Sequence, residues 1–209
     1  MVFSDELEIA LQRGSDAHFA QITEYLNAGG DVNDVDEHGT SMLTLNLIYE
    51  GGDHLDVDML DEDDRLRIVR LLLARGADTN TRSGFGGRTP LFQACNCEDQ
   101  EFGLGAIRCL LEAGANIDQK TDGEVEESPL SASLDWLRYD NHWGVIGLPY
   151  VSLLLRYGPD LDGCWGDDRS VEDCLRHIEE PDAFPELDGA YYRTMPPVET
   201  KEQFLACKK

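Results

Sequence analysis

A short pattern occurs four times in the 209-residue sequence and strongly limits how the chain can fold. A glycine followed two residues later by Asp or Asn stands at Gly29, Gly76, Gly114 and Gly158. Apolar residues lie three, four and seven positions before each of these glycines, which is the spacing of one helix face. Glycine also suits the left-handed conformation that ends many helices. The pattern therefore predicts four helices, each ending at its glycine.

A second helix is predicted after each of these glycines and the extended loop that follows it. Hydroxyl residues that can cap a helix N-terminus precede the next apolar stretch each time, at Thr40 and Ser41, Thr89, Ser128 and Ser170. Two of these caps are followed by proline, which fits the first helical position because its missing N–H is not needed there. Each unit is thus expected to hold two helices and one long loop.

The caps, apolar helix faces and glycines recur at the same relative positions in each unit. Together they resemble the ankyrin repeat over about residues 4–178. The resemblance is strongest at Thr89-Pro90-Leu91, where Phe92 replaces the His of the family's Thr-Pro-Leu-His start. It implies an all-α ankyrin-repeat solenoid of four to five helix pairs with enlarged repeats and hairpin-like loops. The expected array spans residues 1–180, with units at about 4–33, 34–80, 81–118 and 119–162, a cap at 163–180 and a proline-containing tail at 181–209.

The units are longer than the family period of about 33 residues. Successive glycines of the pattern are 47, 38 and 44 residues apart, whereas the distance from each glycine to the next cap is close to the typical one. The surplus therefore falls between the two helices of a unit, in segments 50–64, 98–103 and 136–150. We expect these insertions to project from one side of the stack.

The charge is strongly negative and concentrated near the start of the chain. The sequence has 42 acidic and 17 basic residues, a net charge of -25, and its first 64 residues hold 17 acids and one base, Arg13. Such a charge repels nucleic-acid phosphates and anionic lipids, so neither nucleic acid nor membrane is an expected partner, whereas a cationic protein is favoured. The N-terminus lacks a signal-like basic and apolar stretch, and the six cysteines lack a disulfide-framework spacing. We expect a cytoplasmic protein with reduced thiols.

The sequence contains no recognisable catalytic or metal-binding motif. The five histidines are scattered, and Cys95, Cys97 and Cys109 would supply three zinc ligands where a structural site normally has four, so buried, inert thiols are favoured. Segment 83–88 lacks the lysine and hydroxyl of a phosphate-binding loop and is better explained as a hairpin tip. The acidic clusters lack the glycine and glutamate of a calcium loop. The sequence predicts no cofactor, no metal and no enzyme activity.

The acidic run at 61–64 has two interpretations. In the first turn of a helix it would complement the helix dipole, and Asp61 with Arg65 and Asp63 with Arg67 would form ion pairs. This local role does not account for Asp53, Asp56 and Asp58, and for the acidic region as a whole the alternatives are a solvated face and a docking surface for a partner. The two interpretations remain open.

The ankyrin resemblance implies that the loop tips and the first helix of each pair form a groove that binds other proteins. Candidate partner-binding residues on the tips and in the acidic region are Glu37, His38, Asp56, Asp58, Asp61, Phe85, Arg88, Glu124, Glu126, Trp165 and Asp167. The third insertion adds three aromatic candidates, Trp136, Tyr139 and Trp143. The alternatives are that the aromatic residues pack on neighbouring loops or on an enlarged unit core, and that the acids form a solvated face.

The leading functional hypothesis is a protein that binds and inhibits a cationic partner, with the acidic region steering the encounter. Small ankyrin proteins of this kind look like bacterial immunity proteins that neutralise a cognate toxin. The alternative is an adaptor or regulatory subunit that positions a partner without inhibiting it. An enzyme on this scaffold is the least favoured class.

Overall fold

A computed structural model describes residues 3–13, 15–48, 62–84, 86–123, 126–136 and 144–160. The segment from 49 to 61 and everything after residue 160 lie outside the described residues. The first insertion is therefore described only from Glu62 onwards, and the expected cap and tail are not described at all.

The described residues form eight α-helices, and apart from two isolated β-bridges they contain no extended pairing. In chain order the helices are α1 (Asp5–Arg13), α2 (Asp16–Asn27), α3 (Met42–Leu47), α4 (Glu62–Ala74), α5 (Pro90–Cys95), α6 (Gln100–Glu112), α7 (Pro129–Asp135) and α8 (Gly144–Arg156). This part of the chain is therefore all-α, as predicted.

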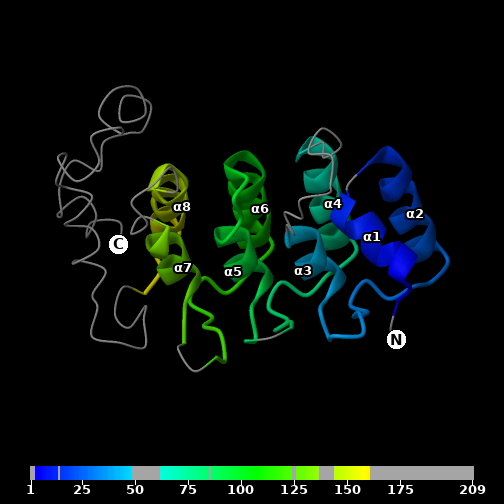
Figure 1. Cartoon of the computed structure of the whole chain (residues 1–209), viewed down its shortest axis with the longest axis horizontal. Helices are drawn as coiled ribbons and strands as arrows, with labels where there is room; N and C mark the ends of the chain where they lie inside the picture. The colour runs from blue at the N-terminus through cyan, green and yellow to red at the C-terminus, as the bar shows by residue number, and fades with distance from the viewer. Residues whose placement is uncertain are drawn as a thin grey trace.

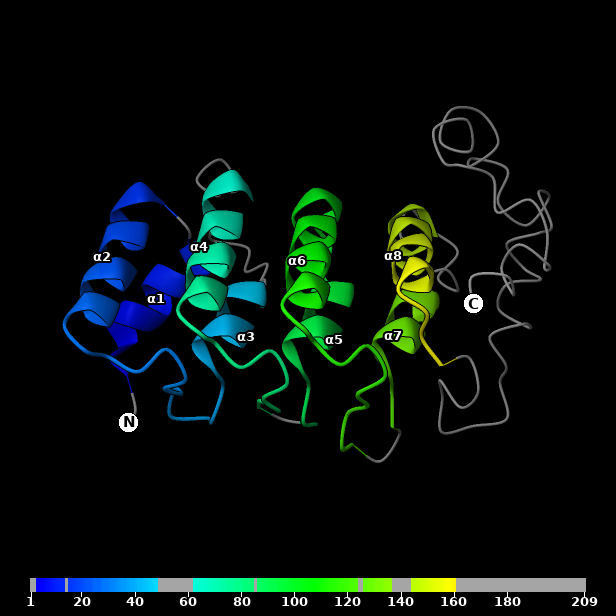
Figure 2. The ribbon, with the colours of Figure 1, turned by 180° about the vertical axis from the view of Figure 1, so that it is seen from behind.

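The helices stand in pairs, side by side in chain order, from α1 and α2 at one end to α7 and α8 at the other (Figure 1). The first helices of the pairs form one row, called here the front row (α1, α3, α5, α7). The second helices form the back row (α2, α4, α6, α8), which faces the viewer in Figure 2. The long loops between pairs extend beyond the lower edge of both rows in these views.

Hydroxyl caps begin the short helices of the front row. The Oγ atoms of Ser41, Thr89 and Ser128 accept the backbone N–H three residues further on, and each cap residue has extended backbone angles. At the first of these sites Thr40 belongs to the preceding loop instead, because its N–H donates to Asp36 Oδ1 at 2.6 Å. The cap is therefore Ser41, one residue after Thr40.

Glycines end the back-row helices as the sequence predicts. Gly29, Gly76, Gly114 and Gly158 all have positive φ, between 70° and 97°. A side chain in this conformation would collide with the backbone at a cost of roughly 1–2 kcal/mol, so glycine is the residue that fits.

The core lies between the two rows. The apolar residues seven and four positions before each glycine are buried in every back-row helix, except that Tyr25 is half-buried. The front row contributes its own buried residues, including Leu11, Leu43, Leu91 and Leu130. Burial of this continuous apolar layer is the main force that holds neighbouring pairs together.

A ladder of Asn and Asp side chains links the loops that follow the back-row helices. Asn33 Oδ1 accepts the N–H of Asp78 at 2.8 Å, and Asn80 Oδ1 accepts the N–H of Asn116 at 2.7 Å. Asp118 Oδ1 accepts the N–H of Asp160 at 2.7 Å. These hydrogen bonds connect each unit to the next and fix the spacing of the loops.

Candidate partner-binding face

Three hairpins extend from the front row and form the candidate binding face with it. They are hairpin 1 (residues 34–41), hairpin 2 (82–89, in which residue 85 is not described) and hairpin 3 (121–127, in which residues 124 and 125 are not described). Hairpins 1 and 2 are closed by the bridges Val35 to Ser41 and Ser83 to Arg88, and hairpin 3 by a 2.9 Å hydrogen bond from Thr121 N to Glu127 O. The prediction that segment 83–88 is a hairpin tip is confirmed.

Glu37 and His38 lie at the tip of hairpin 1. Their side chains are 80% and 65% exposed, and His38 Nε2 lies 3.5 Å from Glu37 Oε1. Beneath them the buried carboxylate of Asp36 accepts the N–H groups of His38 at 2.9 Å and Thr40 at 2.6 Å. Asp36 therefore shapes a tight turn that presents the two candidate residues to solvent.

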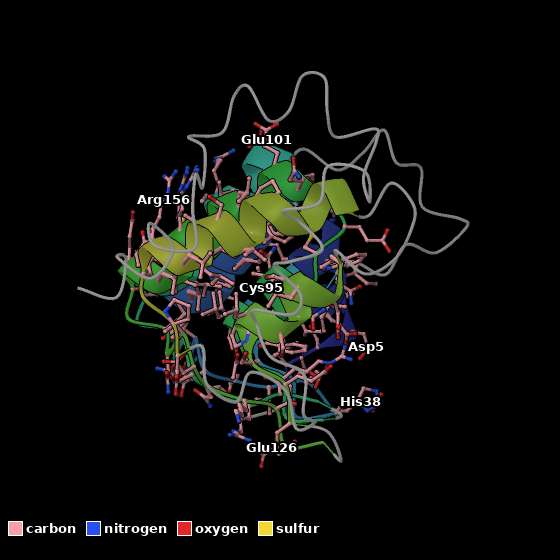
Figure 3. All side chains as sticks on the ribbon, turned by 90° about the vertical axis from the view of Figure 1, so that its left-hand side faces the viewer. Asp5, His38, Cys95, Glu101, Glu126 and Arg156 are labelled. Carbon is pink, nitrogen blue, oxygen red and sulfur yellow. The ribbon has the colours of Figure 1, made fainter. Side chains whose placement is uncertain are left out.

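Acids of α1 extend this negative end of the face. Glu8 is partly buried, and its pKa is raised first by that burial and then by the negative charges of Asp36 and Asp5. Figure 3 places Asp5 and His38 on the same side of the molecule, opposite Arg156. Sequence reasoning did not select Asp5 or Glu8, although their position in the first turn of a helix was a signal for them.

Arg88 lies on hairpin 2 and is exposed. Its guanidinium carbon is 5.5 Å from the centre of the Phe92 ring, the residue that replaces the histidine of the family motif. Phe92 is buried in the core. The guanidinium therefore lies over the face of the ring at a cation–π distance while Arg88 remains exposed.

Glu126 lies on hairpin 3, exposed to solvent at the lower end of the molecule in Figure 3. Its carboxylate lies 4.0 Å from Lys120 Nζ. Exposed pairs of this length contribute little stability, so both charges can engage a partner.

Trp136 is half-buried instead of standing free on the surface. Its indole N–H donates to the backbone carbonyl of Cys95 at 3.1 Å, from α7 to the end of α5. This contact matches the alternative in which aromatic residues of the third insertion cap an enlarged unit. The remaining candidates lie outside the described residues: Asp56, Asp58, Asp61, Phe85, Glu124, Tyr139, Trp143, Trp165 and Asp167.

The expected pairs of Arg65 with Asp61 and of Arg67 with Asp63 stay predictions, because the side chains of both acids lie outside the described ones. Arg65, expected beside Asp61, is buried in the core. Arg67 is exposed and bonds to Asp64, one turn earlier, and to Asp16 of α2 at 2.9 Å. An arginine in the core must be hydrogen-bonded or stacked, and the helix register turns position 65 inward.

The three described thiols, Cys95, Cys97 and Cys109, are buried or half-buried. Burial raises the pKa of Cys95 to about 12 and that of Cys97 to about 11, which supports the inert-thiol interpretation for these two residues. Cys109 is half-buried. Within the described ranges no three His, Cys, Asp or Glu side chains are placed to hold a metal ion.

Comparison with known proteins bears on the central part of the chain. No helix among the described residues is long and apolar enough to cross a bilayer. No curated protein matches the sequence. A model of the ankyrin repeat matches residues 86–122, from hairpin 2 through α5 and α6 into hairpin 3. The match supports an ankyrin-repeat protein, and ankyrin repeats indicate a protein–protein interaction module that is generally not an enzyme.

Proposed function

We propose that this chain is an ankyrin-repeat solenoid that binds a cationic protein through its front row and hairpins, and that it inhibits that protein. An immunity protein that neutralises a toxin with a basic, nucleic-acid-binding cleft is the kind of protein that fits this description. The observation that carries the proposal is the acidic end of the face, where Asp5, Glu8 and Glu37 gather around hairpin 1.

The overall charge adds a long-range contribution. A net charge of -25 attracts a basic partner over distances near the Debye length, about 8 Å at physiological salt, and raises the association rate. Exposed acids on the face then give the encounter its direction. An inhibitor gains from this arrangement because it competes with an anionic substrate for the same basic cleft.

Matched variants separate the effect of where the acidic residues lie from the effect of the total charge on partner binding. The front variant Glu37→Lys with Glu126→Lys and the back variant Glu24→Lys with Glu112→Lys change the net charge equally, and all four residues are exposed. We expect the front variant to recover much less partner from a lysate of the source organism than the wild type does, and the back variant to recover nearly as much.

The partner's own properties decide the remaining points. It is expected to be basic, to bind less tightly as salt increases, and to lose its activity in the complex. A neutral or acidic partner, or equal loss of binding in both variants, would contradict binding through the acidic face. A complex that keeps the partner's full activity would point to the adaptor alternative.

A further inference from the structure

The three hairpins are fastened to one another and form a continuous strip, called here the hairpin ledge (residues 34–41, 82–89 and 121–127). Ser83 Oγ joins hairpins 1 and 2 because it accepts the backbone N–H of Ser41 and the hydroxyl of Thr44, both at 3.2 Å. Asp122 N donates to Gly86 O at 3.0 Å and joins hairpins 2 and 3. These hydrogen bonds therefore set the order and spacing of the hairpin backbones along the ledge.

The sign of the charge alternates along this ledge. Among the described residues, hairpin 1 has three acids and no Lys or Arg, hairpin 2 has two arginines and no acid, and hairpin 3 has three acids and no Lys or Arg. The exposed members in the described residues are Glu37 on hairpin 1, Arg82 and Arg88 on hairpin 2, and Asp122 and Glu126 on hairpin 3. A positive site thus lies between two negative ones.

The ion pairs of these charges are long, including the 4.0 Å pair of Glu126 with Lys120, which stands just before hairpin 3. Arg82 Nη1 lies 3.9 Å from Asp122 Oδ2, and both side chains remain about half exposed. Arg88 rests above Phe92 and has Glu127 near it. Long, exposed pairs of this type are weak and exchange readily for a better-aligned partner group.

We propose that the partner segment lying across the hairpin ledge has two cationic clusters with a carboxylate between them, and that the carboxylate meets Arg82 and Arg88. This inference rests on the proposed function, which requires only a cationic partner, and adds the order of charges to it. A uniformly basic segment would place a cation against the two arginines, where like charges repel.

The dimensions suggest a probe. Packed helices stand about 8–10 Å apart, so successive hairpins are separated by a similar distance. A partner helix rises about 1.5 Å per residue, and about seven residues span one such interval. Alanine-rich helical peptides with charged pairs at three positions seven residues apart can therefore match the ledge.

The experiment compares two peptides of identical composition and a third, more basic one. One has the order Lys, Glu, Lys at the three positions, the second has Glu, Lys, Lys, and a third has lysine at all three. Affinities for the wild-type protein are measured by fluorescence anisotropy at low salt. We expect the alternating peptide to bind about fivefold more tightly than the reordered one, as expected for one or two exposed charge contacts.

Variants of the protein locate the effect. In Arg82→Glu with Arg88→Glu the preference for the alternating order should disappear and the all-lysine peptide should bind more tightly. The neutral pair Arg82→Gln with Arg88→Gln should remove the preference with less risk to folding. The matched control, Arg70→Glu with Arg108→Glu, changes two exposed arginines of the back row and should leave the preference unchanged.

The outcomes separate the two proposals. Tight binding of the all-lysine peptide with no preference between the two orders would overturn the inference about the ledge and leave the proposed function standing. A preference that survives both hairpin 2 variants would also overturn it. If no cationic peptide binds the wild type, the proposed function itself fails.

Discussion

The guanidinium carbon of Arg65 lies 3.9 Å from the centre of the Phe102 ring, so that a charge on α4 stacks against a ring on α6 inside the core. Arg65 is 1% exposed, and its Nη2 donates to the backbone carbonyl of Asn46 on α3 at 2.8 Å. One side chain therefore joins three helices of two neighbouring units. Stacking and hydrogen bonding offset part of the cost of burying its charge.

Replacing Arg65 should destabilise the fold. In Arg65→Ala the carbonyl of Asn46 loses its donor and a cavity forms beside Phe102, and we expect the free energy of unfolding to fall by about 2–4 kcal/mol. Urea denaturation followed by circular dichroism measures the change. Arg70→Ala on the exposed side of the same helix is the control, with an expected change within about 0.5 kcal/mol. Equal effects of the two substitutions would show that Arg65 contributes little in the core.

Gly103 and Gly105 of α6 should respond differently to alanine. A Cβ at Gly103 would overlap the Tyr150 hydroxyl, whose single proton is shared between the carbonyls of Cys97 and Asp99, each 3.0 Å away. We expect Gly103→Ala to lower the unfolding free energy by about 1–3 kcal/mol through overpacking.

Gly105 provides the comparison, because a Cβ there would meet only the flexible end of Leu66, at 2.8 Å. Gly105→Ala should be neutral or stabilising, since alanine favours a helix interior over glycine by about 1 kcal/mol. Thermal unfolding of both variants tests the difference. A stabilising Gly103→Ala would mean that Tyr150 moves aside without loss.

Tyr25 should make stability fall at alkaline pH. Burial, together with the 2.5 Å hydrogen bond that its hydroxyl donates to Asp34, raises the pKa of Tyr25 to about 12. An unfolded tyrosine titrates near pH 10, so the stabilisation is complete below about pH 10 and is lost as the pH rises towards 12. Because solvent screens the half-buried ring, we expect a loss of about 1 kcal/mol.

Unfolding free energies between pH 8 and 12 measure this loss. Tyr25→Phe should flatten the alkaline part of the curve. Tyr157→Phe, at an exposed position just after α8, should leave it as in the wild type. If the unfolding free energies of the wild type and of Tyr25→Phe fall equally as the pH rises, the hydrogen bond to Asp34 does not raise the pKa of Tyr25.

The thiols of the central unit should react at different rates. Cys95 and Cys97 are buried and their raised pKa values disfavour the reactive thiolate, whereas Cys109 is half-buried. With iodoacetamide at pH 8, peptide mass spectrometry should find Cys109 modified at least tenfold faster than Cys95. Denaturing the protein with urea should remove the difference. Rapid modification of Cys95 in the native protein would contradict its burial.

The regular part of the fold could be predicted because one set of physical requirements recurs in every unit. A hydroxyl cap, an apolar helix face and a left-handed glycine are each local signals, and their shared register in four places removes most of the ambiguity of any one of them. The caps Thr89 and Ser128 and the glycines Gly76 and Gly114 follow that register.

The positions of individual charged and aromatic side chains could not be predicted in the same way. Arg65 stands beside acids and other arginines in the sequence, and only the packing of α4 against α6 brings Phe102 over it. Tryptophan is a residue type that often binds partners from an exposed position. The indole N–H of Trp136 instead donates to the backbone carbonyl of Cys95, 41 residues earlier in the sequence. Both depend on contacts between units, which no local pattern encodes.

In the Asn and Asp ladder, the loss of one hydrogen bond affects only one junction between neighbouring units. Each rung, such as the one from Asn80 to Asn116, reaches only the adjacent unit, and nothing in the ladder spans two interfaces. Cutting one rung should therefore weaken a single junction and allow the shorter part of the array to melt while the longer part persists. Denaturation would then become a stepwise process that starts at the damaged junction instead of one all-or-none transition.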